Sequence, residues 1–168
     1  MTHADPRATL AFDEQCVSYD VTANTWQESV RIVGDMLGER GFATPAYTEE
    51  MIDLIERTGP YVVVRAGIAL VHAQPGNETL RNGLCAIRLA TPVRFGHAHY
   101  DPVECVIGLA VTTPEEHLTV VASLANALDD DELLDRIRNF RDEHEAVREV
   151  IDRNERLRIE SSESAAVA

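Results

Sequence analysis

The residues of this sequence best suited to chemistry near neutral pH are its histidines. The chain has six of them: His3, His72, His97, His99, His117 and His144. A free imidazole titrates at about pH 6.5, and its neutral form acts as a nucleophile or as a metal ligand. Because His3 and His144 lie in polar segments, we interpret them as solvated side chains and treat the other four as candidates.

His72 directly follows an apolar run, residues 68–71, in the stretch AGIALVHAQPG. The run predicts a buried strand, and Gln74, Pro75 and Gly76 then turn the chain. The histidine would therefore stand where a rigid scaffold meets solvent, which is where reactive groups tend to lie. The alternative is a histidine that only packs against the end of the core.

His117 falls in the first turn of a helix predicted to begin at Thr113 and Pro114. The free N–H groups and the positive end of the helix dipole favour an anion there. Histidine can carry a phosphoryl group covalently, so a second imidazole at such a position would suit phosphoryl chemistry. From the spacing alone, two unrelated histidines remain the simpler interpretation.

His97 and His99 form an H-A-H pair with Asp101 close by in the sequence. In a strand the two imidazoles would face the same side, and a metal-dependent hydrolase using them together with His72 is conceivable. No further ligand has a convincing spacing, however. We therefore expect neither a metal centre nor a cofactor.

The composition bounds the remaining function classes. The 168 residues favour one domain, and 29 acidic against 15 basic side chains give a net charge of -14. Such a charge disfavours nucleic-acid binding and would suit a basic partner surface, although simple solubility explains it as well.

The cysteines and the apolar runs favour a cytoplasmic protein. Cys16, Cys85 and Cys105 are odd in number and contain no CxxC pair, which argues against a disulfide framework. We find no signal peptide and no run of about 20 apolar residues, so we expect no membrane insertion.

Apolar periodicity and capping signals predict the elements that must position the histidines. Helices are expected from Thr25 to Gly41, from Thr44 to Gly59 and from Thr113 onward, with shorter ones near 133–140 and 142–152. The predicted strands are 61–64, 67–71, 84–89 and 103–111, and 90–102 is read as a connector. The expected fold is α/β: a mixed sheet of about five strands flanked by helices on both faces. We expect one domain over 11–152, with flexible ends at 1–10 and 153–168.

Three segments of the sequence together resemble a known family. They are GPYVVVRAGIALVHAQPGNETLRNGL, TPVRFGHAHYDPVECVIGLAV and EEHLTVVASLANALDDDELL. The set is similar to the enzyme IIA component of the sugar phosphotransferase system (PTS). Within that family it resembles the mannitol/fructose type, and within this type an ascorbate-like subgroup. The resemblance covers roughly residues 28–150.

The resemblance implies a fold and an activity. Family members have a mixed sheet flanked by helices, take a phosphoryl group from the phosphohistidine of the carrier protein HPr onto one histidine, and pass it to a cysteine of a IIB domain. His72 matches the acceptor, and His117 matches a second histidine beside the phosphoryl group. Arg57 is the nearest candidate for an arginine that the family often has in the preceding helix. No cofactor or metal is implied.

Three positions depart from the family pattern. Ala66 and Val71 stand where the family usually has proline, and Gln74 stands where it usually has arginine. Loss of a cation beside the phosphoryl group would slow transfer or alter the carrier interface. The chain could therefore be a regulatory module that binds partner proteins according to its phosphorylation state. The sequence names no particular sugar, and a homodimer remains possible.

Overall fold

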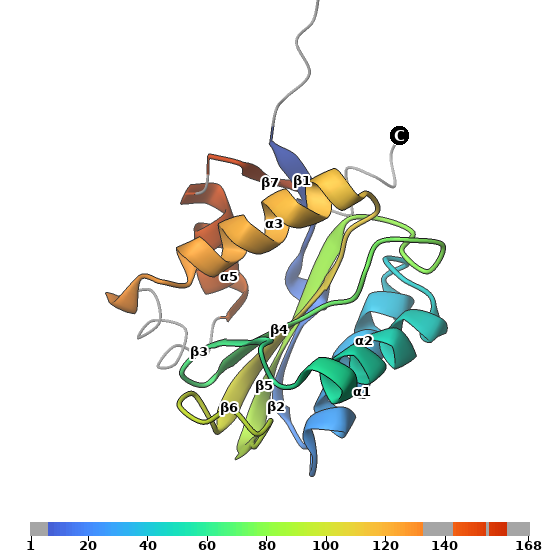
Figure 1. Ribbon diagram of the computed structural model, residues 1–168. Coiled ribbons are helices and arrows are strands. Elements are labelled where there is room, and N and C mark those ends of the chain that lie inside the picture. Colours follow the sequence, from blue (N-terminus) through green and yellow to red (C-terminus); the bar gives the residue numbers. More distant parts are fainter. Residues whose placement is uncertain (1–6, 133–142, 154, 161–168) are drawn as a thin grey trace, which may run out of the picture.

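The computed structural model describes residues 7–132, 143–153 and 155–160 (Figure 1). In this part of the chain the strands are β1 (Ala8–Ala11), β2 (Val17–Val21), β3 (Val63–Arg65), β4 (Ile68–Val71), β5 (Gly83–Val93), β6 (Val103–Ala110) and β7 (Leu157–Glu160). The helices are the short 3-10 helix η1 (Glu14–Cys16) and α1 (Trp26–Glu39), α2 (Pro45–Thr58), α3 (Pro114–Ala127) and α5 (Glu143–Arg153).

The described strands form one mixed sheet in the order β3-β4-β6-β5-β1-β7, with β2 paired to β5 beside this path. The β3–β4 and β5–β6 pairs are antiparallel and the other pairs are parallel. Figure 1 shows α1 and α2 packed together on one side of the sheet and α3 with α5 on the other. The predicted α/β class with helices on both faces is confirmed, although the sheet has seven strands in the described residues rather than about five.

The helix boundaries follow from the capping signals in the sequence. The Thr25 side chain accepts a hydrogen bond from the Glu28 N–H at the start of α1, and Thr113 does the same for Glu116 at the start of α3. Pro45 opens α2 and Gly59 caps its end with a φ of 92°, a conformation that favours glycine. The helix predicted near 133–140 lies outside the described residues.

The predicted flexible ends are wrong where they overlap two strands. Residues 8–11 pair in parallel with residues 157–160, from Ala8 opposite Leu157 to Ala11 opposite Glu160. Both strands have only four residues, too few for an alternating pattern to be distinguished from a charged tail. The strand β2 was missed as well, and β5 continues to Val93 instead of ending before the predicted connector.

The parallel pair of β4 and β6 positions the candidate site. Val71, the last residue of β4, lies opposite Gly108 of β6. His72 follows the end of β4, and residues 111–113 lead from β6 directly into α3, which carries His117. Because neighbouring parallel strands end at the same edge of a sheet, both histidines are delivered to one edge.

The packing of α1, and of the segment that follows it, on the sheet depends on two close approaches at glycines. A Cβ atom at Gly108 would lie 2.9 Å from Cγ2 of Val33 in α1, and one at Gly83 would meet the Phe42 ring. Phe42 is buried, and its backbone carbonyl accepts hydrogen bonds from the loop that precedes β5. The start of β5 is therefore tightly enclosed.

We expect Gly83→Ala to lower the free energy of unfolding by about 1–3 kcal/mol, since the added methyl group overpacks this site. Its Cβ would lie 2.7 Å from Cε2 of the Phe42 ring and closer still to two other ring atoms. Gly76→Ala is the control, because nothing lies within 4 Å of the added Cβ there. Urea denaturation measures both variants, and equal stability of the two would contradict the packing described.

Candidate functional site

The structure brings His72 and His117 together. Their ring centroids are 5.3 Å apart, with an angle of 58° between the ring planes. Both side chains are half-buried, so each has one part in the protein and one part in reach of solvent. Two neutral imidazoles at this spacing can act on one group that enters between them or at their exposed edges.

A backbone hydrogen bond orients the His72 ring. Its Nδ1 lies 3.1 Å from the carbonyl oxygen of Leu70, two residues back in β4. A carbonyl oxygen only accepts, so Nδ1 carries the proton and donates it. The other nitrogen, Nε2, is then left with its lone pair, which is the state that a nucleophilic imidazole needs.

The surroundings keep both imidazoles neutral. Burial lowers the pKa of His72 below its ordinary value of 6.5, and the charge of His117 lowers it further, while the bond to Leu70 opposes these effects in part. Burial also lowers the pKa of His117. At pH 7 the lone pair of His72 is therefore available.

The first turn of α3 offers fewer free N–H groups than its sequence position suggested. Pro114 has no N–H, the Glu116 N–H donates to the Thr113 side chain, and the His117 N–H donates to the Thr113 carbonyl. The positive end of the helix dipole remains. Among the contacts described, the N–H of Glu115 is the first-turn N–H that has no acceptor. The Nδ1 atom of His117 is itself buried and has no hydrogen-bond partner in the described part of the chain.

Asn82 is a site-building residue that the sequence did not single out. Its side-chain oxygen accepts from the Thr112 N–H at 2.8 Å and from the Thr112 hydroxyl at 3.1 Å, and its amide nitrogen donates to Glu116 at 2.8 Å. It thereby ties the start of β5 to the first turn of α3, below His117. A lone Asn before a strand carries no sequence signal that distinguishes it from a turn residue.

Tyr47 was also missed as a site residue, because a tyrosine on the apolar face of a helix is normally a core residue. Its hydroxyl accepts from the Ala73 N–H at 2.9 Å and donates to the Leu109 carbonyl at 2.6 Å. Ala73 is the residue after His72, so this side chain of α2 fixes the chain directly beyond the candidate acceptor.

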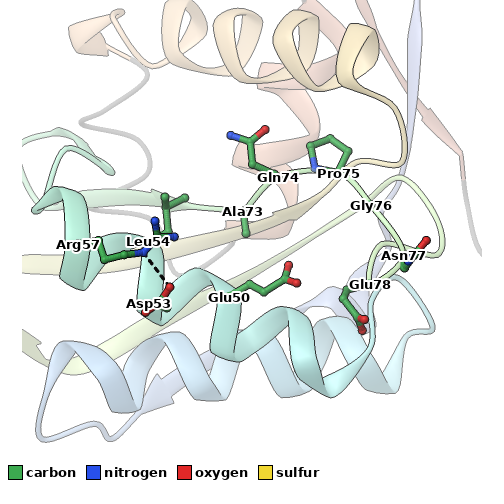
Figure 2. Close-up of a pocket in the computed structure, with 10 residues that line it drawn as sticks. All are labelled: Glu50, Asp53, Leu54, Arg57, Ala73, Gln74, Pro75, Gly76, Asn77 and Glu78. Carbon is green, nitrogen blue, oxygen red and sulfur yellow. Dashed lines mark hydrogen bonds and ion pairs between the residues drawn. The ribbon is translucent and has the colours of Figure 1, made fainter.

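A pocket of about 330 Å³ lies between α2 and the loop that follows His72 (Figure 2). Arg57 lines it and pairs with Asp53 at 2.8 Å on the exposed surface of α2. Gln74 also lines the pocket, and in Figure 2 its side chain extends away from α2. The structure thus places Arg57 beside the loop, paired with a carboxylate.

The His97 and His99 pair is part of a loop. The Nδ1 of His97 accepts from the backbone N–H groups of His99 and Tyr100, both at 3.1 Å, and its ring stacks on the Tyr100 ring at 4.6 Å. The Asp101 carboxylate accepts from the N–H groups of residues 95 and 96. Among the described residues, no group of three or more potential ligands is placed to hold a metal ion.

Comparisons with known proteins define the class first. The crystal structure of IIA mannitol from Escherichia coli superposes with a TM-score of 0.71 and 28% identity, over 84% of this chain and 99% of that one. A complex of enzyme IIA mannitol with phosphorylated enzyme IIB mannitol, also from E. coli, gives 0.71 and 27% over 84% and 96%. The fold is therefore that of the mannitol-type IIA domains.

Sequence comparison then gives the family. The model for the phosphoenolpyruvate-dependent sugar phosphotransferase system, EIIA 2, matches residues 10–153. The ascorbate-specific PTS system EIIA component of E. coli strain K12 is 32% identical over 148 residues, which are 88% of this chain and 95% of that protein. The chain belongs to the EIIA 2 family and is an EIIA component of a sugar phosphotransferase system. No helix in the described residues is long and apolar enough to cross a bilayer.

We expect the imidazoles of His72 and His117 to titrate with midpoints below 6.5, because burial disfavours their charged forms. An NMR pH titration that follows the ring carbon-bound protons of each histidine measures both midpoints. A midpoint at or above 6.5 for His72 would contradict the environment described.

The same shifts predict the sign of a stability effect. With a lowered pKa in the folded state, the unfolded state takes up protons first as the pH falls below 6.5, so acidification lowers the free energy of unfolding. His72→Gln should therefore lose less stability than the wild type between pH 7.5 and 5, as measured by denaturant unfolding at each pH. A steeper loss of stability in His72→Gln than in the wild type would contradict a lowered pKa of His72 in the folded protein.

Proposed function

We propose that this EIIA chain is a phosphoryl carrier that accepts its phosphoryl group on Nε2 of His72. The donor is the phosphohistidine of HPr and the recipient is a cysteine of a IIB domain, as the family resemblance implies. The observation that carries the proposal is the pairing of a tautomer-fixed His72 with His117 at 5.3 Å between ring centroids.

The transfer exchanges one N–P bond for another. The Nε2 lone pair of His72 attacks phosphorus while the bond to the donor imidazole breaks, and the departing nitrogen keeps that electron pair. In the second step the cysteine thiolate of IIB attacks the same phosphorus, and the electron pair returns to Nε2. Neither step needs an oxidant, a metal or an organic cofactor.

His117 would stabilise the phosphoryl oxygens. Phosphoryl transfer depends mainly on positioning and on the neutralisation of charge at those oxygens. The ring of His117 lies beside that of His72, and the α3 helix that carries it starts at residue 114, so its positive dipole end faces the same region. A phosphoryl group with two negative charges would also raise the proton affinity of this imidazole and make it a better donor.

The surface of the chain fits a partner protein of opposite charge. With a net charge of -14, the chain would attract a carrier that has basic residues around its own histidine and would speed the encounter. Both partners work in the cytoplasm, where we place this chain. The Gln74 side chain is exposed, so its uncharged amide lies where the partner would approach.

Ascorbate is the first substrate to test for the complete transport system. The curated relatives are named for ascorbate and share 32% identity with this chain. As the family resemblance implies, this chain would pass its phosphoryl group to a IIB domain, so its part in the system is to carry that group.

Incubation with radioactively phosphorylated HPr tests the proposal. Wild-type protein should acquire an acid-labile, base-stable phosphate, and His72→Ala should acquire none. His117→Ala should be labelled roughly 100-fold more slowly, the usual effect of losing one oxyanion-stabilising donor. His99→Ala, a change in the exposed loop, is the matched control and should match the wild type.

Normal labelling of His72→Ala would refute the acceptor assignment. Equal rates for His117→Ala and the wild type would leave His117 without its stabilising role. If the labelled protein then passes its phosphate to a IIB domain, the transport role is supported over a purely regulatory one. Label that stays on the protein in the presence of IIB would favour the regulatory role.

A further inference from the structure

We propose that Tyr47 is the positioning residue for the phosphoryl acceptor: its hydroxyl replaces a hydrogen bond between β4 and β6 and so sets where His72 leaves the sheet. This proposal rests on the acceptor role proposed for His72. The geometry of the sheet edge that carries the histidines would then depend on a side chain of α2, which is far from both histidines in the sequence.

One oxygen atom of Tyr47 joins two strands. It accepts from the Ala73 N–H at 2.9 Å and lies 2.6 Å from the Leu109 carbonyl oxygen, to which it donates its single proton. The Ala73 carbonyl is farther away, at 3.4 Å. The hydroxyl is therefore an insertion between a backbone donor and a backbone acceptor.

The register of the two strands shows what this insertion replaces. Cys105 lies opposite Ile68, and its N–H donates to the carbonyl of Gly67. In a parallel pair, a residue that forms hydrogen bonds to the neighbouring strand bonds to the two residues that flank its partner there. Every second residue of the strand does so, and counting by twos from Cys105 leads to Leu109. The Leu109 carbonyl would therefore pair next with the Ala73 N–H. Tyr47 bridges those two groups instead.

The bridge is a neutral and permanent one. The Tyr47 side chain is 1% exposed, and burial raises the pKa of its phenol well above the ordinary value of 10. The hydroxyl thus keeps its proton at any pH at which the protein works. Ala73 and Leu109 are buried as well, so removal of the hydroxyl would take away a partner from two buried backbone groups.

The inserted atom spreads the strands at the point where the two histidine-bearing segments diverge. His72 precedes Ala73 by one residue, and Leu109 lies one residue before the end of β6, from which the chain enters α3. A direct backbone bond at this step would draw the loop after β4 toward β6. The gap between the His72 and His117 rings therefore depends on the Tyr47 hydroxyl.

Tyr47→Phe tests this role in a single-turnover assay with phosphorylated HPr. We expect the transfer rate constant to fall roughly 10- to 100-fold, as a small misplacement of reacting groups does. The concentration of phosphorylated HPr that gives half the maximal rate should stay within about twofold, since the docking surface is unchanged. The His72 ring nitrogen shifts should also move in the NMR spectrum of the unphosphorylated variant.

Thr48→Val is the matched control. Thr48 is the next residue of α2 and is buried, but its side chain faces Gly34 of α1 instead of the sheet. It should lose stability while its transfer rate and its His72 shifts stay those of the wild type. Replacement of Tyr47 by p-aminophenylalanine, whose amino group can donate and accept, should restore part of the rate lost in Tyr47→Phe.

Three results would overturn the proposal: an unchanged rate constant in Tyr47→Phe, unchanged His72 ring shifts, or the same rate loss in Thr48→Val. If Tyr47→Phe does not fold, hydrogen exchange in the wild type decides, because the Ala73 amide must be strongly protected. An unprotected Ala73 amide would refute the bridge. If wild-type protein takes up no phosphate, the proposed function fails. The His72 ring shifts and the protection of the Ala73 amide would still test whether Tyr47 positions His72.

Discussion

The bond from Nδ1 of His72 to the Leu70 carbonyl is the interaction on which the proposed phosphoryl transfer depends. It fixes the tautomer, leaves Nε2 as the lone-pair nitrogen and holds the ring against the end of a buried strand. Burial and the nearby His117 both lower the pKa of this imidazole, so that the nucleophilic form persists below the usual titration range. Local backbone geometry and burial thus favour the neutral, singly protonated imidazole that the proposed acceptor role needs.

The sheet converts two distant sequence positions into one site. β4 and β6 run parallel and end together, so a histidine after one strand and a helix start after the other meet at the same edge. Two polar side chains form hydrogen bonds to the segments at this edge. Asn82 bonds to the first turn of α3 and to the residues before it, and Tyr47 bonds to the residue after His72. Tyr47 belongs to α2 and Asn82 to the loop before β5, so two separate parts of the fold contact the segments that carry the histidine rings.

The sequence predicted those features that depend on local patterns. The capping residues Thr25 and Thr113 marked the helix starts, and the apolar run before His72 marked the central strand. The strands at 8–11 and 157–160 were missed because each is stabilised by pairing with the other, a contact between the two ends of the chain that no local window contains. Asn82 and Tyr47 were missed for a related reason: each acts through two or three hydrogen bonds to groups between 26 and 62 residues away, and a polar atom on an otherwise ordinary residue leaves no periodic signal.

The most direct measurement is the attachment site of the phosphoryl group in histidine-labelled protein, read from two-bond proton–nitrogen NMR correlations before and after phosphorylation. We predict that His72 has a protonated Nδ1 in the unphosphorylated protein and carries its phosphoryl group on Nε2 afterwards, with Nδ1 still bonded to Leu70. A phosphoryl group on Nδ1, or a His72 ring that exchanges freely between tautomers, would contradict this prediction.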